Sequence, residues 1–133
     1  MKPSNIQFTN PIIEEISYKI NHTFTKKEGK IDTHNKFDVK IRKGKEQNQA
    51  IVSLKIEVGN PDHKEQEPFA IILVISSMFK WDGEYDEETL NSLLSVNAPA
   101  LLLGYARPMI ASITNMSPYP AYNLPLYNFT EQN

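Results

Sequence analysis

The sequence predicts an α+β fold: a four-stranded antiparallel sheet followed by two C-terminal helices packed on one side of it. Three observations lead to this prediction. Apolar and polar residues alternate in three N-terminal stretches, a fourth stretch is apolar throughout, and helix signals begin only at Asp86. The chain has 133 residues and no cysteine. We therefore expect one domain, residues 1–133, whose core needs no disulfide.

The four expected strands cover residues 15–24, 36–43, 52–58 and 69–79. In the first three, every second side chain is apolar, which is the period of a half-buried strand. His22 falls on the apolar face of the first strand, where a hydrogen-bonded core histidine is expected. The fourth strand, FAIILVISSMF, is apolar on both faces, as in a strand that is covered on both sides.

The connections between these stretches predict which strands are neighbours. Residues 43–49 and 59–68 contain glycine, asparagine or proline and are short, so the second, third and fourth strands should be antiparallel neighbours. The link at residues 25–35 is longer and polar. It is long enough to cross an end of the sheet instead of turning back tightly.

The first expected helix begins at Asp86 and ends near Asn97. Asp86 is placed as an N-cap, and two glutamates follow in the first turn, where the helix dipole favours negative charge. The second helix begins at Asn97 or Ala98, with Pro99 in its first turn. Pro108 clashes with the carbonyl of Gly104 in a regular helix, so this pair predicts a bend.

The residues after Thr89 are almost uncharged. Residues 1–88 hold 13 of the 14 Lys and Arg and 15 of the 16 Asp and Glu, and Arg107 is the only charged residue from Thr89 to Thr130. We expect Arg107 to pair with a carboxylate or with helix-end carbonyls. Polar residues, Pro99 and Gly104 interrupt the uncharged run, so no membrane insertion is expected. The proline-rich stretch that follows, residues 117–129, should be extended.

The sequence offers no specific signal for chemistry. His22, His34 and His63 lack metal-ligand spacing, and no phosphate-binding or nucleophile motif is present. The basic run KKEGK is interleaved with an acid, which does not favour nucleic-acid binding. We therefore expect no catalytic residue, metal, cofactor or nucleic-acid partner. The N-terminus has no apolar signal-peptide core, and with the absence of cysteine this predicts a cytoplasmic protein.

The C-terminal region resembles the SecB protein-export chaperone family. The resemblance rests on the order of strands and helices and on one constellation of residues: Tyr105-Ala106-Arg107, Ile113, Pro120, Asn123-Leu124 and Asn128-Phe129. These motifs cover residues 69–129, whereas the N-terminal strands agree only in pattern. The constellation is fairly specific, and the strands alone would not be.

The resemblance implies an ATP-independent holdase that binds unfolded or precursor proteins through apolar grooves and serves protein transport and translocation. It implies a homotetramer built as a dimer of dimers. The expected client-binding residues are Phe79, Trp81, Met109, Met116, Tyr119, Tyr122, Leu124, Leu126 and Tyr127. The expected oligomer interface consists of Leu90, Leu93, Leu94, Ile16 and Tyr18.

Two departures from the family pattern concern the SecA translocation motor. Related proteins continue beyond Phe129 with a helix and an acidic tail, whereas here four residues follow it. Positions that match the acidic SecA dock hold Glu15 but also Lys19, Ala70 and Ile72. SecA is therefore a doubtful partner.

Three alternatives to an export holdase remain open from the sequence. The chain could be the dedicated chaperone of a toxin–antitoxin system, as some relatives are. It could instead be a structural or adaptor subunit whose apolar third is a permanent interface with one folded partner. An enzyme on an α+β scaffold is the third alternative, and a pocket with paired titratable residues would support it.

Overall fold

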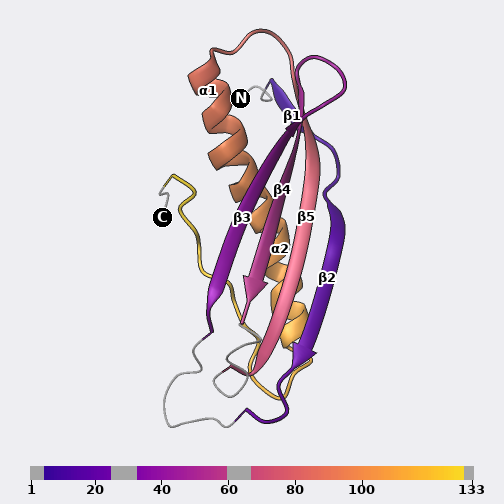
Figure 1. The fold of residues 1–133 in the computed structure, drawn as a ribbon, viewed down its shortest axis with the longest axis vertical. Coiled ribbons are helices and arrows are strands. Elements are labelled where there is room, and N and C mark those ends of the chain that lie inside the picture. Colours follow the sequence, from indigo (N-terminus) through magenta and orange to yellow (C-terminus); the bar gives the residue numbers. More distant parts are fainter. Residues whose placement is uncertain (1–4, 25–32, 60–66, 131–133) are drawn as a thin grey trace.

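The computed structural model describes residues 5–24, 33–59 and 67–130 (Figure 1). The strands are β1 (Ile6–Phe8), β2 (Ile12–Ile20), β3 (Asn35–Lys43), β4 (Gln49–Val58) and β5 (Phe69–Trp81). The helical part consists of α1 (Glu87–Ser92), a π-helical turn η2 (Leu93–Asn97) and α2 (Ala98–Thr114). The α+β class is confirmed. The sheet has five strands instead of four, and the two expected helices form one joined run.

All strands pair antiparallel, in the order β1-β5-β4-β3, and β2 also pairs with β5. The 13 residues of β5 accommodate β1 and β2 one after the other on the same edge. The expected neighbours β3–β4 and β4–β5 are confirmed. β2 and β3 lie at opposite edges of the sheet, so the chain crosses from one edge to the other between them. Residues 25–32 of this link lie outside the described residues.

The N-terminal strands differ most from the prediction. β1 was not predicted, because three residues are too few to show a period. β2 begins at Ile12 and contains a bulge at Glu14, whose Oε1 accepts a hydrogen bond of 2.8 Å from Ser76 Oγ. The strand ends at Ile20, where Asn21 Oδ1 accepts from Thr23 N at 3.1 Å and forms a turn. His22 lies in this turn and is exposed, so it is not the expected core histidine.

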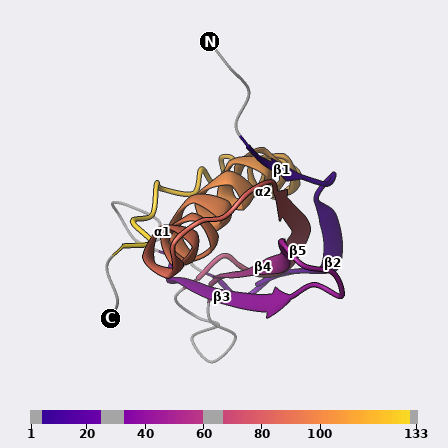
Figure 2. The same cartoon turned by 90° about the horizontal axis from the view of Figure 1, so that it is seen from above.

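The hydrophobic core lies between the sheet and α2, which packs on β4 and β5 (Figures 1 and 2). Alternate residues of β4 and β5 point to α2 and are almost completely buried, among them Leu54, Ile56, Leu73 and Ile75. On the opposite face of β5, Ala70, Ile72, Val74 and Met78 are only half-buried. The expectation that β5 is covered on both sides is therefore not met within the described chain.

The start of the helical run agrees with the prediction. Asp86 Oδ1 accepts a hydrogen bond of 2.9 Å from Thr89 N, and hydrogen bonding by the side chain and then the backbone of Thr89 lowers the pKa of Asp86. Pro99 lies in the first turn of α2, as expected. The expected break between two helices at Asn97 is absent from the described helical run. Instead, η2 makes one wider turn that joins α1 to α2, and the Ala98 N–H donates to Leu93 O. α2 continues through Pro108.

Candidate functional site

The C-terminal segment, residues 115–130, leaves α2 and returns beside β3 (Figure 1). Beyond the bonds of its first three residues, two hydrogen bonds attach this segment to the helix, at Tyr122 and Leu124. Arg107 Nε donates to Leu124 O at 2.8 Å, and Thr114 Oγ1 accepts from Tyr122 N at 2.7 Å. Among the described residues, Arg107 therefore pairs with a carbonyl of this segment and not with the expected carboxylate or helix-end carbonyl. Leu124 itself is fully buried in the core, so the segment is part of the folded structure.

Thr114 is a residue whose role the sequence does not indicate. Its hydroxyl is fully buried, donates to Ile110 O at 2.8 Å and accepts from Tyr122 N. We expect Thr114→Val to lower the free energy of unfolding by about 1–3 kcal/mol, because the Tyr122 N–H loses its partner. Chemical denaturation measures this value. Thr114→Ser keeps the hydroxyl and should be much less harmful; equal losses in both variants would contradict the hydrogen-bond explanation.

Aromatic rings join the end of this segment to β3. Tyr127 stacks on Phe37 with ring centroids 4.4 Å apart and an interplanar angle of 25°. Phe129 makes edge contacts with both rings, at 6.3 Å from Phe37 and 4.9 Å from Tyr127. Offset stacking and edge-to-face contacts of this kind are favourable. They hold the C-terminal segment close to the inward face of β3.

A hollow of about 690 Å³ lies between β3, the start of the helical run and the C-terminal segment. We call it the β3 hollow. Its lining combines three aromatic rings and three aliphatic side chains with four polar residues, of which Asp38, Ser92 and Thr130 are exposed and Ser95 is half-buried. Such a mixture suits the apolar side chains of another polypeptide together with its polar backbone. The lining residues are Phe37, Asp38, Val39, Ile41, Ser92, Ser95, Val96, Tyr127, Phe129 and Thr130.

Of the expected client-binding residues, only Tyr127 lines the β3 hollow. Met116 and Leu126 are 88% and 83% exposed on the C-terminal segment and are not among the lining residues. The core holds Phe79, Trp81 and Leu124, and the residues Met109, Tyr119 and Tyr122 are half-buried.

The hollow-lining residues contributed by β3 and the helical run were not predicted from the sequence. The alternation in residues 36–43 showed that Phe37, Val39 and Ile41 share one face. It did not show that β3 is an edge strand, which leaves part of this face uncovered. Ile41, at 41% exposure, is the clearest sign of that open face.

A second apolar surface lies on the opposite edge of the sheet, over β1, β2 and α2. We call it the β2 patch and define it as Phe8, Ile13, Ile16, Tyr18 and Tyr105. Four of these are between 41% and 46% exposed. The Tyr18 hydroxyl is enclosed and has no hydrogen-bond partner among the described residues, and burial raises the pKa of Tyr18. A contiguous exposed apolar surface of this kind is typical of a protein interface.

The expected interface residues therefore fall in two places. Ile16 and Tyr18 belong to the β2 patch. Leu94, at 8% exposure, belongs to the core of the single chain, while Leu90 and Leu93 are half-buried on the first part of the helical run. Leu94 therefore stabilises the single chain, because its side chain is part of the hydrophobic core.

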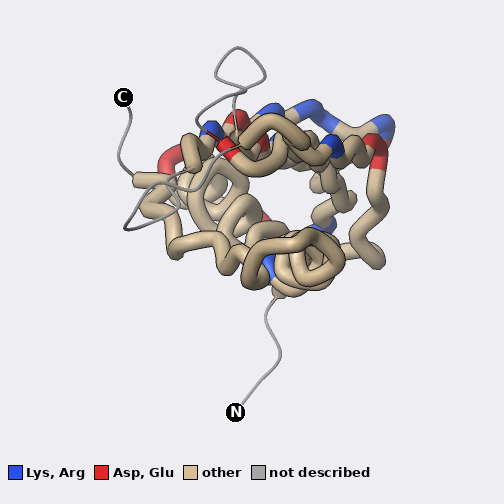
Figure 3. Tube along the Cα trace, turned by 90° about the horizontal axis from the view of Figure 1, so that it is seen from below, with Lys and Arg blue, Asp and Glu red and all other residues tan. Residues whose placement is uncertain are grey.

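Many charged residues lie along the strands of the sheet (Figure 3), and the register places Lys36, Asp38, Lys40 and Arg42 of β3 on the face turned away from α2. Glu15, Lys19, Ala70 and Ile72, the positions that match the SecA dock, lie on this face. A hollow of about 360 Å³ on the same face has Lys19, Lys36 and Glu57 in its lining. The exposed lining of this hollow is mostly apolar but contains no phenylalanine, tyrosine or tryptophan, whereas the β3 hollow is lined by the rings of Phe37, Tyr127 and Phe129.

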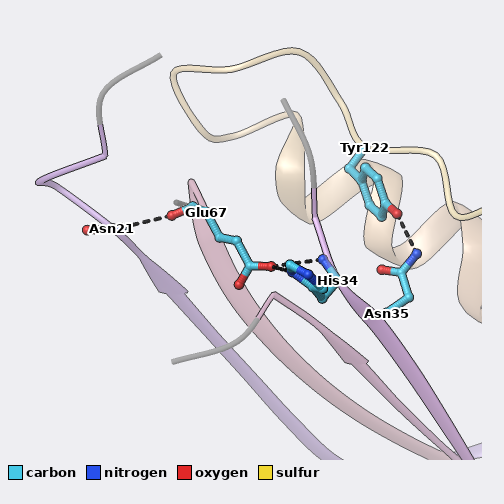
Figure 4. A network of polar contacts seen from close by, with 5 residues as sticks. All are labelled: Asn21, His34, Asn35, Glu67 and Tyr122. Atoms are coloured by element: carbon cyan, nitrogen blue, oxygen red, sulfur yellow. Dashed lines mark hydrogen bonds and ion pairs between the residues drawn. The ribbon is translucent and has the colours of Figure 1, made fainter. Parts of the chain in front are cut away.

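A network of polar contacts closes one end of the sheet (Figure 4). Glu67 is 2% exposed; its Oε1 accepts a hydrogen bond of 2.8 Å from His34 N and also contacts His34 Nδ1. The backbone carbonyl of Glu67 accepts from Asn21 Nδ2 at 2.8 Å. Asn35 Nδ2 donates to the Tyr122 hydroxyl at 2.6 Å. The network links the ends of β2, β3 and β5 and ties β3 to the C-terminal segment.

Neither a metal site nor a membrane span is found among the described residues. No group of three or more histidine, aspartate or glutamate side chains there is arranged to hold a metal ion. No helix in that part of the chain is long and apolar enough to cross a membrane.

Several solved structures share this fold, among them the following two. One is the SecB-like chaperone Rv1957 of Mycobacterium tuberculosis, in complex with a ChAD peptide from the Rv1956 HigA1 antitoxin. It matches with a TM-score of 0.74 and 13% identity, over 93% of this chain and 91% of that chain. A protein of unknown function from Streptococcus agalactiae matches with a TM-score of 0.55 and 15% identity, over 93% and 99%. At these identities the likeness concerns the fold, which is that of SecB-like chaperones.

The sequence places the chain more narrowly. The family model for SecB, described as the preprotein translocase subunit SecB, matches residues 4–132. This chain therefore belongs to the SecB family, which confirms the resemblance found in its motifs. Members of the family are chaperones and not enzymes, so the prediction of a non-enzymatic protein is confirmed and a chaperone role is supported. A comparison with curated protein sequences gives no match.

Proposed function

We propose that this chain is an ATP-independent holdase that binds unfolded or precursor polypeptides in the β3 hollow and keeps them from aggregating. The observation that carries the proposal is the hollow itself, an open hollow of about 690 Å³ in a member of a chaperone family, in which three aromatic rings and three aliphatic side chains lie beside four polar residues. Clients of a holdase share no sequence. Affinity for them must come from apolar burial, which is non-directional, and the aromatic lining provides it.

The β2 patch supports self-association, and a homotetramer built as a dimer of dimers is the assembly we propose. Its four exposed apolar side chains and the unpartnered Tyr18 hydroxyl gain contacts in an interface. Light scattering on the purified chain should give a mass near four chains. The Ile16→Glu variant should give a smaller mass, because a charge placed in the patch opposes its burial.

Suppression of aggregation tests the chaperone activity. A chemically unfolded model protein is diluted with the chain at matched subunit concentrations and without nucleotide. We expect stoichiometric suppression, and we expect Ile41→Glu to weaken it about five- to tenfold, since a charge enters the hollow and apolar contact is lost.

Ile12→Glu is the matched control for this experiment. Ile12 is 59% exposed and pairs with Ser76 on β5, at the opposite edge of the sheet from the β3 hollow. The same substitution there should leave suppression unchanged. No suppression by the unmodified chain would contradict the holdase proposal and would favour the adaptor alternative, in which one specific folded partner covers the apolar surfaces.

A dedicated antitoxin chaperone is a second candidate function. The observation that favours it is the likeness to Rv1957, a chaperone solved with a peptide from an antitoxin. Binding of one particular client with much higher affinity than unrelated unfolded proteins would support this role. SecA is not proposed as a partner, because Lys19, Ala70 and Ile72 leave the matching surface with little acidic character. We place the chain, as one domain, in the cytoplasm, in keeping with its lack of cysteine.

A further inference from the structure

β3 has a backbone edge that no other strand occupies within the described parts of the chain. It is the last strand in the sheet order, and its nine residues pair with β4 on one side only. No backbone hydrogen bond from residues 5–24, 33–59 or 67–130 reaches its outer edge. An unpaired strand edge is a template for another extended chain, since its N–H and C=O groups require partners.

The inward side chains of β3 determine which side chains of an added strand are favoured on the inner face of the sheet. Phe37, Val39 and Ile41 point inward and line the β3 hollow. In a neighbouring strand, the side chains opposite them lie about 4.5–5.5 Å away, measured between Cβ atoms, and therefore project over the same hollow. Apolar side chains are favoured at these positions because they complete the burial of the aromatic lining.

The outward side chains of β3 alternate with these and are charged. Lys36 and Asp38 lie opposite Glu57 and Lys55 of β4, so each has a residue of opposite charge across the strand pair. Lys40 and Arg42 do not: they lie opposite Ser53 and Ile51. Both are exposed, and neither forms an ion pair in the part of the chain that the structure describes. Lys40 and Arg42 therefore lie beside the free edge without an acidic partner among the described residues.

From this geometry we infer that a client binds to the β3 edge as an added strand, in which apolar side chains over the β3 hollow alternate with acidic side chains beside Lys40 and Arg42. The inference rests on the proposed function and specifies its client class. The backbone of the client pairs with the edge, one set of side chains fills the hollow, and the other set neutralises the two cations.

The same charges disfavour the other occupants of this edge. If two copies of β3 paired antiparallel around Ile41, Lys40 of one copy would lie opposite Arg42 of the other, and like charges across a strand pair are destabilising. Cations on an edge strand are a common means of preventing such self-association. A basic client meets the same repulsion, so the edge selects among unfolded chains instead of accepting all of them equally.

Short labelled peptides test the charge preference. Three nine-residue peptides alternate valine with glutamate, serine or lysine, and fluorescence anisotropy measures their affinity for the whole chain. We expect the order glutamate, serine, lysine, with roughly two- to fivefold tighter binding for each acidic residue beside a cation. The double variant Lys40→Glu, Arg42→Glu should reverse the order. The control, Lys19→Glu with Lys80→Glu, makes the same change in net charge on β2 and β5 and should preserve it.

N-methylated peptides test the backbone pairing. Methylation of an amide that faces β3 removes a hydrogen bond, whereas methylation of the next amide does not, so affinity should vary with a period of two residues. The inference is overturned if the three peptides bind equally or if methylation has no such period. Suppression of aggregation that remains sensitive to Ile41→Glu would then leave the holdase proposal intact. Loss of suppression by the unmodified chain would instead overturn the proposed function itself.

Discussion

Replacing Leu124 with alanine should lower the free energy of unfolding by about 2–5 kcal/mol, the range for a large apolar side chain removed from a well-packed core. Leu124 is fully buried although it lies in an irregular, proline-rich segment. Its carbonyl also accepts the Arg107 hydrogen bond of 2.8 Å, so a shift of the segment weakens a polar contact as well. Denaturant unfolding followed by circular dichroism measures the change.

Leu126 provides a matched control two residues further along the same segment. It is 83% exposed, so Leu126→Ala should change the stability by no more than about 0.5 kcal/mol. Equal effects at the two positions would mean that the segment is not anchored by Leu124. From the sequence, both residues were expected to bind clients. Leu124 lies in the core of the single chain, whereas Leu126 is exposed and its role in client binding stays a prediction.

Removing the Glu67 side chain should destabilise the protein by about 3 kcal/mol, because the amide and the ring nitrogen of His34 lose their buried partner. Glu67 accepts from the His34 amide and contacts the imidazole of His34, and its carbonyl holds Asn21. Glu67→Ala therefore releases the start of β3 from the start of β5. Thermal and denaturant unfolding measure the loss.

Two further variants separate the network from general effects of charge. Glu67→Gln keeps an oxygen acceptor for the His34 amide and should cost less than Glu67→Ala. Glu84→Ala removes the same charge at an exposed position and should have little effect. If Glu67→Ala unfolds at the same denaturant concentration as the unmodified chain, the network does not hold the end of the sheet together.

The sequence predicted those parts of the fold that depend on local signals. Period-two alternation located β3 and β4, the continuous apolar run located β5, and Asp86 marked the start of the helical run. These signals succeed because each reflects a rule within one element, either strand periodicity or helix capping. β1 failed this test because its three residues, Ile6–Phe8, are too few to show any period.

The β3 hollow is formed by elements that are distant in sequence, and most of its lining residues were not predicted. The inward face of β3 resembles that of β4 in sequence, yet Ile56 of β4 is fully buried and Ile41 of β3 is 41% exposed. The difference arises from the position of each strand in the sheet, which periodicity does not contain. Leu124 shows the opposite error. Its proline-rich surroundings suggest a surface segment, and only the contacts with the core and Arg107 reveal an anchor.

The place of Leu124 in the chain also affects how this protein is made. It follows every other core residue in sequence, so it is the last of them to leave the ribosome. Domains fold as units during synthesis, and until this leucine emerges the core of β4, β5 and α2 lacks one of its fully buried side chains. The nascent chain thus shows apolar surface late into its own translation. During that interval it belongs to the class of molecules that chaperones bind.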